Sequence, residues 1–176
     1  MAAMNEGELA QRAAAGDANA FAALVRLHQS RLRGFLRRMT RGDHALADDL
    51  AQETFLEAHR KLASWRGEGS FVSWLYAIAY SRYLMTARRR KLEPLEEADV
   101  SSPSPESASA LRLDLEKAMS HLSPGERGAL TLCFALGMSH EEAAMALAIP
   151  IGTLKSHVSR GREKLKTMLH MWDTGP

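Results

Sequence analysis

Residues 137–166 read GMSHEEAAMALAIPIGTLKSHVSRGREKLK, and this stretch decides how the C-terminal part of the chain folds. Ser139, with Glu142 three residues on, has the pattern of a capping box, so we expect a helix to begin there. Pro150 ends that helix, because proline lacks a backbone donor and clashes with the preceding turn. A second helix is expected to begin near Ile151. The stretch therefore predicts two helices joined by a tight turn.

The second helix of this pair has one apolar and one basic face. Small or apolar side chains recur at helical spacing and should face inward, namely Leu154, Val158, Gly161, Leu165 and Met168. The outer face carries hydroxyl groups and is flanked by cationic side chains, which suits the major groove of DNA. The plainer interpretation is an amphipathic helix pair with a solvated basic face. The rest of the chain is needed to choose between this interpretation and DNA binding.

Composition and periodicity predict an all-α protein. The 176 residues are 45% hydrophobic and 25% charged, which suits one folded domain or two small helical ones. Helical periodicity dominates, and no convincing strand alternation is present. Residues 93–110 hold three prolines, five serines and five acids, which is typical of a flexible linker. We therefore expect two helical domains, residues 1–92 and 111–171, joined by a flexible acidic linker at residues 93–110.

Several classes of protein are disfavoured by the sequence. Cys133 is the single cysteine, so no disulfide can form within the chain, which suits the cytoplasm. No apolar run approaches the ~20 residues that span a bilayer, and the N-terminus lacks a signal-peptide pattern. Ala144 stands where a zinc-binding HExxH helix starting at His140 needs its second histidine. We expect no catalytic residue, no metal site, no cofactor and no membrane insertion.

The helix expected over residues 45–63 carries an acidic and apolar surface. Its carboxylates recur every four residues, at Asp49, Glu53 and Glu57, beside a second ridge of Asp48 and Gln52. Phe55 and Leu56 cannot both enter the core on the side of Leu50, so at least one should be partly exposed. An apolar side chain ringed by polar ones is typical of a partner-binding surface. The alternative is that both are core residues and the acids are merely solvated.

A glycine-rich loop, SWRGEGS at residues 64–70, precedes a helix expected over residues 71–91 that ends in ARRRK. Aromatic side chains alternate there with arginines, a combination that suits unpaired bases and phosphates. The buried stripe of the helix is expected to be Phe71, Trp74, Leu75, Ile78 and Met85. Trp65, Tyr80 and Tyr83 are the aromatics that we expect to be exposed.

Three motifs in series resemble the extracytoplasmic-function group of sigma factors of bacterial RNA polymerase. They are ADDLAQETFLEAHRKL (47–62), FVSWLYAIAYSRYLMTARRRK (71–91) and LSPGERGALTLCFALGMSHEEAAMALAIPIGTLKSHVSRGREKL (122–165). The resemblance implies that the first domain is sigma region 2 and the second sigma region 4. It also implies an alternative sigma factor that binds core polymerase, directs it to specific promoters and helps to melt the −10 element.

The resemblance assigns surfaces residue by residue. Binding of core polymerase, at its β′ clamp helices, falls to Asp48, Asp49, Gln52, Glu53, Phe55 and Leu56, and the β flap is a second contact of the family. Recognition of the promoter −10 element falls to Trp65, Arg66, Ser70, Tyr80, Ser81, Arg82 and Arg88. Recognition of the −35 element falls to Thr153, Lys155, Ser156, His157, Ser159, Arg160 and Lys164.

The chain departs from the family pattern at four positions. The family usually has Asn at Ser81, Asp at Met85, Arg at His157 and Ala at Gly161. A neutral imidazole is a poorer partner for phosphate or guanine than a guanidinium, so His157 weakens one expected contact.

Two further expectations concern regulation and class. The resemblance implies an anti-sigma factor, and we expect it to cover the residue 48–56 face, the second helix of the pair, or both. The free chain could instead close on itself. The alternative function is a free-standing helix-turn-helix regulator of duplex DNA. Such a regulator has no need for the acidic and apolar helix or for the glycine-rich loop.

Overall fold

The computed structural model describes residues 5–92 and 110–173, and these form helices joined by short turns. The first domain contains α1 (Glu6–Ala14), α2 (Ala18–Met39), α3 (His44–Lys61), a 3₁₀ turn η1 (Leu62–Ser64) and α4 (Phe71–Leu92). The second contains α5 (Ala110–Ser120), α6 (Pro124–Leu130), a π-helical segment η2 (Thr131–Ala135), α7 (His140–Leu147) and α8 (Ile151–Asp173). Within these residues there is no strand, so the all-α prediction is confirmed.

The predicted linker falls mainly on residues 93–109, which lie outside the described residues. Its last position, Ala110, is the first residue of α5.

Polar caps fix where the helices begin. Asp17 accepts hydrogen bonds from the amides of Asn19 (2.9 Å) and Ala20 (3.1 Å) and so caps α2. The capping box at α7 is present, with the Glu142 amide 3.2 Å from the Ser139 hydroxyl and the Ser139 amide 2.9 Å from the Glu142 carboxylate. The helix pair predicted at residues 137–166 is therefore confirmed, including its break at Pro150.

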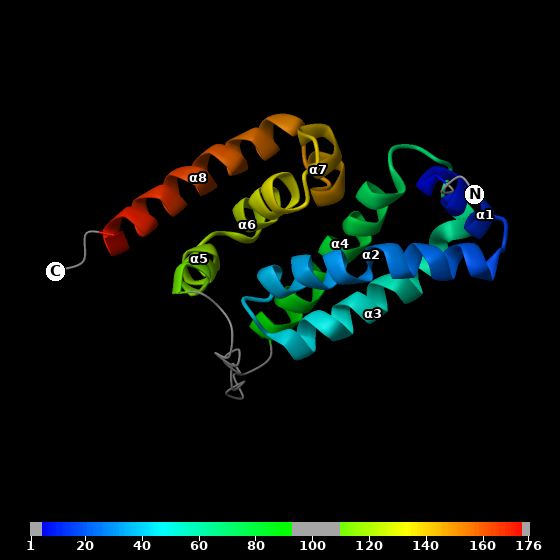
Figure 1. Cartoon of the computed structure of the whole chain (residues 1–176), viewed down its shortest axis with the longest axis horizontal. Coiled ribbons are helices and arrows are strands. Elements are labelled where there is room, and N and C mark those ends of the chain that lie inside the picture. The colour runs from blue at the N-terminus through cyan, green and yellow to red at the C-terminus, as the bar shows by residue number, and fades with distance from the viewer. Residues whose placement is uncertain (1–4, 93–109, 174–176) are drawn as a thin grey trace.

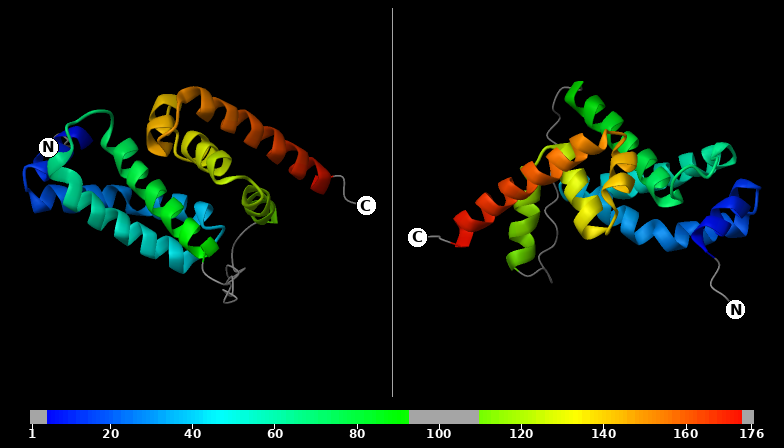
Figure 2. Two further views of the ribbon diagram at one scale, coloured as in Figure 1. Left: turned by 180° about the vertical axis from the view of Figure 1, so that it is seen from behind. Right: turned by 90° about the horizontal axis from the view of Figure 1, so that it is seen from above.

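The two domains share one core, which α4 joins (Figures 1 and 2). In both figures α6 and α7 lie beside the first domain, while α8 runs along the outer side of the second. The shared core contains Phe35 and Tyr76 of the first domain and Leu130 and Leu147 of the second. A smaller cluster, with Leu24, packs α1, α2 and the start of α4 together.

The burial of α4 differs from the sequence prediction. Phe71 and Leu75 are buried as expected, but Met85 is 56% exposed, and the buried set includes Tyr80 at 8% and Tyr83 at 9% exposure. The physical reason is that α4 packs on both sides, against the first domain and against the second domain, so a single apolar stripe does not describe it. The prediction that these two tyrosines are exposed was wrong.

One side chain of α5 and one of η2 are not fully buried. Leu115 of α5 is 44% exposed, whereas Ala118, three residues on, is fully buried. Cys133 lies in the π-helical segment η2 and is only partly buried, and that burial raises the pKa of its thiol.

Candidate nucleic-acid and polymerase interfaces

The predicted −35 face lies on the outer side of α8. Leu154 and Val158 are buried against the domain, and Lys155 and Ser156 between them are exposed. Four side chains of the predicted set are exposed: Lys155, Ser156, Ser159 and Arg160. Thr153 is partly buried at the start of the same helix. This part of α8 can therefore approach a DNA groove without rearrangement of its own domain.

His157 and Lys164 lie close to α6. A Cβ atom placed on Gly125 would lie 2.7 Å from the Nε2 atom of His157, so the imidazole packs against the start of α6. The Nζ atom of Lys164 donates to both carboxylate oxygens of Glu126, at 2.8 and 2.9 Å. The structure thus places both side chains beside α6, and their part in −35 recognition stays a prediction.

Gly161 belongs to the same α6–α8 contact. A Cβ atom there would lie 2.8 Å from Cδ1 of Leu130. The absence of a side chain lets α8 approach α6 closely. Two of the four departures from the family pattern, at positions 157 and 161, therefore have a packing explanation.

Glu126 ties α6 to α8, and its replacement should measurably destabilise the second domain. Its carboxylate also completes the α6 capping box by accepting from the Ser123 amide at 3.0 Å. Burial by itself raises the pKa of Glu126, but the hydrogen bonds from Lys164 and Ser123 outweigh burial and hold the pKa below its ordinary value. A carboxylate with a lowered pKa stabilises the fold above its ordinary pKa and loses that contribution as pH falls.

We therefore expect Glu126→Gln to lower the free energy of unfolding by about 1–3 kcal/mol at pH 7. The difference from the native chain should shrink as the pH falls through the pKa of the folded carboxyl, because the native carboxylate then becomes neutral too. Urea unfolding at pH 7 and at successive steps below pH 4.5, the ordinary pKa of the carboxyl, measures both effects. Equal stability of the two proteins at pH 7 would contradict this reading of Glu126.

The predicted polymerase-binding face of α3 is exposed. Leu56 is 53% exposed, as predicted for at least one of the two apolar residues, and Asp49 and Gln52 beside it are exposed as well. Phe55 is only partly exposed and packs against both core clusters. Of these two apolar side chains, Leu56 is therefore the more exposed.

Basic side chains of the same domain partly balance the acids of α3. Asp48 lies 3.8 Å from Arg33 and 3.6 Å from Arg37 of α2. Its side chain is still 51% exposed, so these are weak surface pairs. Glu53, also 53% exposed, is 3.8 Å from Arg82 of α4.

The third acid of the predicted ridge, Glu57, has a different role. Its side chain is only 17% exposed and pairs with Arg82 and Lys61, each at 2.9 Å. These partners, first of all Lys61, hold the pKa of Glu57 below its ordinary value. Arg82, which was predicted to read the −10 element, lies on α4, links it to α3 through this pair and keeps 30% of its side chain exposed.

The predicted −10 residues differ in how far they are exposed. Arg66, Ser81 and Arg88 are exposed. Ser70 accepts a hydrogen bond from the Ser73 amide at 3.1 Å, so its hydroxyl stabilises the start of α4. Tyr80 is buried beneath the second domain.

The loop before α4 places Trp65 between solvent and core. The indole is half-buried and meets Phe71 edge-on, with ring centroids 6.0 Å apart. Its buried Nε1 atom makes no hydrogen bond in the described part of the chain. Gly67 and Gly69 both have φ of +74°, a conformation that favours glycine and lets the loop turn sharply.

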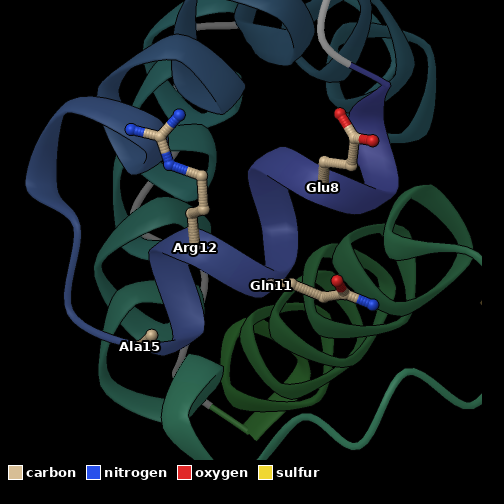
Figure 3. Close-up of a pocket in the computed structure, with 4 residues that line it drawn as sticks. All are labelled: Glu8, Gln11, Arg12 and Ala15. Atoms are coloured by element: carbon tan, nitrogen blue, oxygen red, sulfur yellow. The ribbon is translucent and has the colours of Figure 1, made fainter.

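Figure 3 shows a surface hollow whose lining residues all come from one helix or its end. Its lining residues, Glu8, Gln11, Arg12 and Ala15, lie on α1 or at its end. The Arg12 guanidinium already pairs with Asp17, the residue that caps α2. We therefore assign this hollow no ligand.

Two other kinds of site were sought in the same residues. Over 5–92 and 110–173, no helix has the length and apolar character needed to cross a membrane. In these ranges the His, Cys, Asp and Glu side chains form no group of three that could hold a metal ion.

The fold and surfaces define a two-domain helical protein with a helix-turn-helix at its C-terminal end. Family models match both domains: Sigma-70 region 2 over residues 24–93 and Sigma-70, region 4 over residues 112–165. The chain belongs to the sigma-70 family, in the group of extracytoplasmic-function sigma factors. A free-standing helix-turn-helix regulator does not account for both matches.

Individual relatives agree with this family. The RNA polymerase sigma-H factor of Pseudomonas aeruginosa is 33% identical over 92% of this chain and 92% of its own length. The ECF RNA polymerase sigma-E factor of Haemophilus influenzae is 31% identical over 94% of this chain and 96% of its own. The ECF sigma factor SigE of Mycolicibacterium smegmatis is 35% identical over 83% of this chain, which spans only 60% of that relative.

Two solved structures share the fold. The sigma factor RpoE in complex with the anti-sigma factor NepR from Bartonella quintana has a TM-score of 0.73 and 31% identity, covering 85% of this chain and 96% of its own. CnrH in complex with the cytosolic domain of CnrY also has a TM-score of 0.73, with 27% identity over 94% of this chain and 97% of its own.

Proposed function

We propose that this chain is an alternative sigma factor that recruits core RNA polymerase through the exposed α3 face around Leu56. It directs the enzyme to promoters whose −35 element is read by α8. The −10 element is read by the residue 65–70 loop and α4. The observation that carries this proposal is the outward row of Lys155, Ser156, Ser159 and Arg160 on a helix-turn-helix whose chain also exposes an acidic and apolar face.

The proposed function combines two weak DNA contacts that polymerase holds near the promoter. Two small DNA-reading surfaces gain little alone, but on a polymerase each acts at high effective concentration. Trapping the −10 strand only when it is unpaired shifts the promoter toward the open state. In this role the chain supplies binding and no catalytic group. It would act in the cytoplasm, where polymerase and promoters are.

An anti-sigma factor is the partner that we propose for regulation. The proposal is supported by the two solved relatives in complexes, one with the anti-sigma factor NepR and one with the cytosolic domain of CnrY. The α3 face and the outer face of α8 are the exposed surfaces that such a partner can cover. Covering either one removes an essential contact with polymerase or promoter.

Transcription in vitro tests the proposed function without knowledge of the promoter. Core polymerase from the same bacterium is incubated with its sheared genomic DNA, with and without the chain, and the 5′ ends of the transcripts are sequenced. We expect a set of start sites that depends on the chain and shares one pair of upstream elements. Identical start sites in both reactions would contradict the proposal.

A further inference from the structure

A small hollow lies where the end of α2, the start of α3 and the last turns of α4 meet. Its volume is about 140 Å³, and its polar lining consists of Thr40, Arg41, Tyr83, Thr86 and Arg90. One water molecule occupies ~30 Å³ in the liquid, so the hollow has room for an oxyanion of the size of phosphate.

Two arginines reach the hollow from different helices. Arg41, just after α2, is exposed, and within the described ranges its guanidinium pairs with no carboxylate. Arg90 of α4 is paired, because its Nη1 atom lies 3.2 Å from Oδ2 of Asp43. The other oxygen of Asp43 accepts from the Leu46 amide at 2.9 Å and caps α3. The two guanidiniums therefore have one carboxylate beside them, and that carboxylate also serves as a helix cap.

A third guanidinium lies next to the hollow. Arg127 of α6 is fully buried, and its Nη1 atom donates at 2.7 Å to the carbonyl of Met39, which lines the hollow. Its other nitrogens donate to carbonyls of α5 and of the turn after it, and it pairs with no carboxylate among the described residues. Burial lowers the pKa of Arg127, Tyr83 opposes that shift, and the charge of Arg41 adds to it. Arg41 is thus close enough for the two positive charges to repel each other.

The region therefore has a surplus of positive charge. Arg41, Arg90 and Arg127 are offset by one carboxylate, and the C-terminal end of the α2 dipole adds only about half a negative charge. Cations gathered around a concave surface attract an anion. Arg41 also has a φ of +57°, which favours glycine, so the backbone gives no reason for an arginine at this position.

The uncharged part of the lining adds a hydrogen-bond donor. The Thr86 hydroxyl, one turn before Arg90, makes no hydrogen bond in the part of the chain that the structure describes. The Thr40 hydroxyl is already engaged, 3.0 Å from the Asp43 carbonyl. Guanidinium and hydroxyl donors suit phosphate oxygens, which arginine can bind with two parallel hydrogen bonds.

From these features we propose that the hollow binds one phosphate group. Arg41 and Arg90 hold its oxygens, Thr86 donates a further hydrogen bond, and the rest of the phosphorylated molecule stays in solvent. A nucleotide and the backbone of DNA both carry this group. The site goes beyond the proposed function and does not depend on it, because no residue of its lining was assigned to polymerase or promoter.

Titration of the full chain with inorganic phosphate at pH 7, followed by two-dimensional ¹H–¹⁵N NMR, tests the site. Sodium chloride at the same ionic strength is the reference, because salt alone also screens exposed charges. We expect saturable shifts at the amides of Arg41, Thr86 and Arg90. Their dependence on phosphate concentration gives the dissociation constant.

Arg41→Gly is the decisive variant, because it removes the guanidinium and relieves the positive φ at once. We expect it to bind phosphate about tenfold more weakly, while its unfolding temperature is no lower than that of the native chain. A purely structural role for Arg41 predicts the opposite, a less stable chain with unchanged affinity. Arg38→Gln is the matched control, since Arg38 is an exposed arginine in the last turn of α2 that does not line the hollow.

A short labelled DNA duplex without promoter elements identifies the source of the phosphate group. Loss of phosphate binding in Arg41→Gly with unchanged affinity for the duplex assigns the site to a free phosphorylated molecule, and loss of both assigns it to the DNA backbone. If Arg41→Gly does not fold, Arg90→Gln is judged by the same criteria.

Two outcomes would overturn the phosphate site. One is the absence of saturable shifts at these amides beyond those that chloride causes, and the other is equal phosphate affinity in Arg41→Gly and Arg38→Gln. These measurements use neither polymerase nor a promoter, so their result is independent of the transcription assay that tests the proposed function.

Discussion

Leu56→Asp should weaken binding of core polymerase by about 2–4 kcal/mol, which corresponds to roughly 30-fold or more. Leu56 is 53% exposed on the α3 face, so its replacement removes the apolar contact and adds a charge without disturbing the core. Titration of labelled core polymerase with each chain measures the loss. Because Leu56 is so exposed, the variant should keep the stability and helical content of the native chain.

Leu27→Asp is the matched control, because Leu27 of α2 is also 53% exposed and lies outside the proposed face. It should bind core polymerase as the native chain does. Asp49→Lys should also weaken binding, by reversing a charge at the docking surface. Native affinity in both Leu56→Asp and Asp49→Lys, with the fold intact by circular dichroism, would remove the α3 face from the proposed function.

Phe55→Ala is a poorer probe of the same surface, although the sequence favoured it equally. Phe55 packs against both core clusters, so its truncation should leave a cavity and cost stability as well as binding. The sequence showed that Phe55 and Leu56 could not both be buried. Only the packing of α3 between α2 and α4 decides which of the two faces solvent.

Local signals were sufficient to predict the helices themselves. Ser139 caps α7 where the sequence placed its start, because capping depends on side chains a few residues apart, and Asp17 and Ser123 cap α2 and α6 in the same way. The helix-turn-helix and its outward basic row followed from the same local rules. The short helix α1 was not anticipated, although Asn5 caps it and two of its own residues, Ala10 and Ala13, are buried.

Contacts between the domains could not be predicted in this way. The burial of Tyr80 depends on Gly128, 48 residues away along the chain, and the role of Arg127 depends on a carbonyl at Met39. An arginine after a Ser-Pro helix start looks like an ordinary solvated side chain, and no spacing marks it as buried. Similarly, no local pattern indicates that Lys164 pairs with Glu126 or that His157 lies close to Gly125, because both contacts join α8 to α6.

Removing the exposed cationic side chains of α8 should weaken recognition of the −35 element. Lys155 and Arg160 are exposed on the outer face of α8, and the Nε atom of Arg160 donates to the Ser156 carbonyl at 3.3 Å. Replacing either by alanine should cost about 1–3 kcal/mol at a promoter with its −35 element intact, if the side chain contacts a base. Multi-round transcription by reconstituted polymerase, from start sites found in the genomic assay, measures the loss.

Scrambling the −35 element separates base contacts from phosphate contacts. A base contact predicts that the alanine variant and the native chain become equally weak on the scrambled promoter. A phosphate contact predicts the same proportional loss on both promoters, together with a shallower dependence of binding on salt concentration. Lys166→Ala is the matched control, since Lys166 is exposed on the same helix but lies outside the proposed set. If Lys155→Ala and Arg160→Ala both used the −35 element as well as Lys166→Ala does, α8 would not be the helix that reads it.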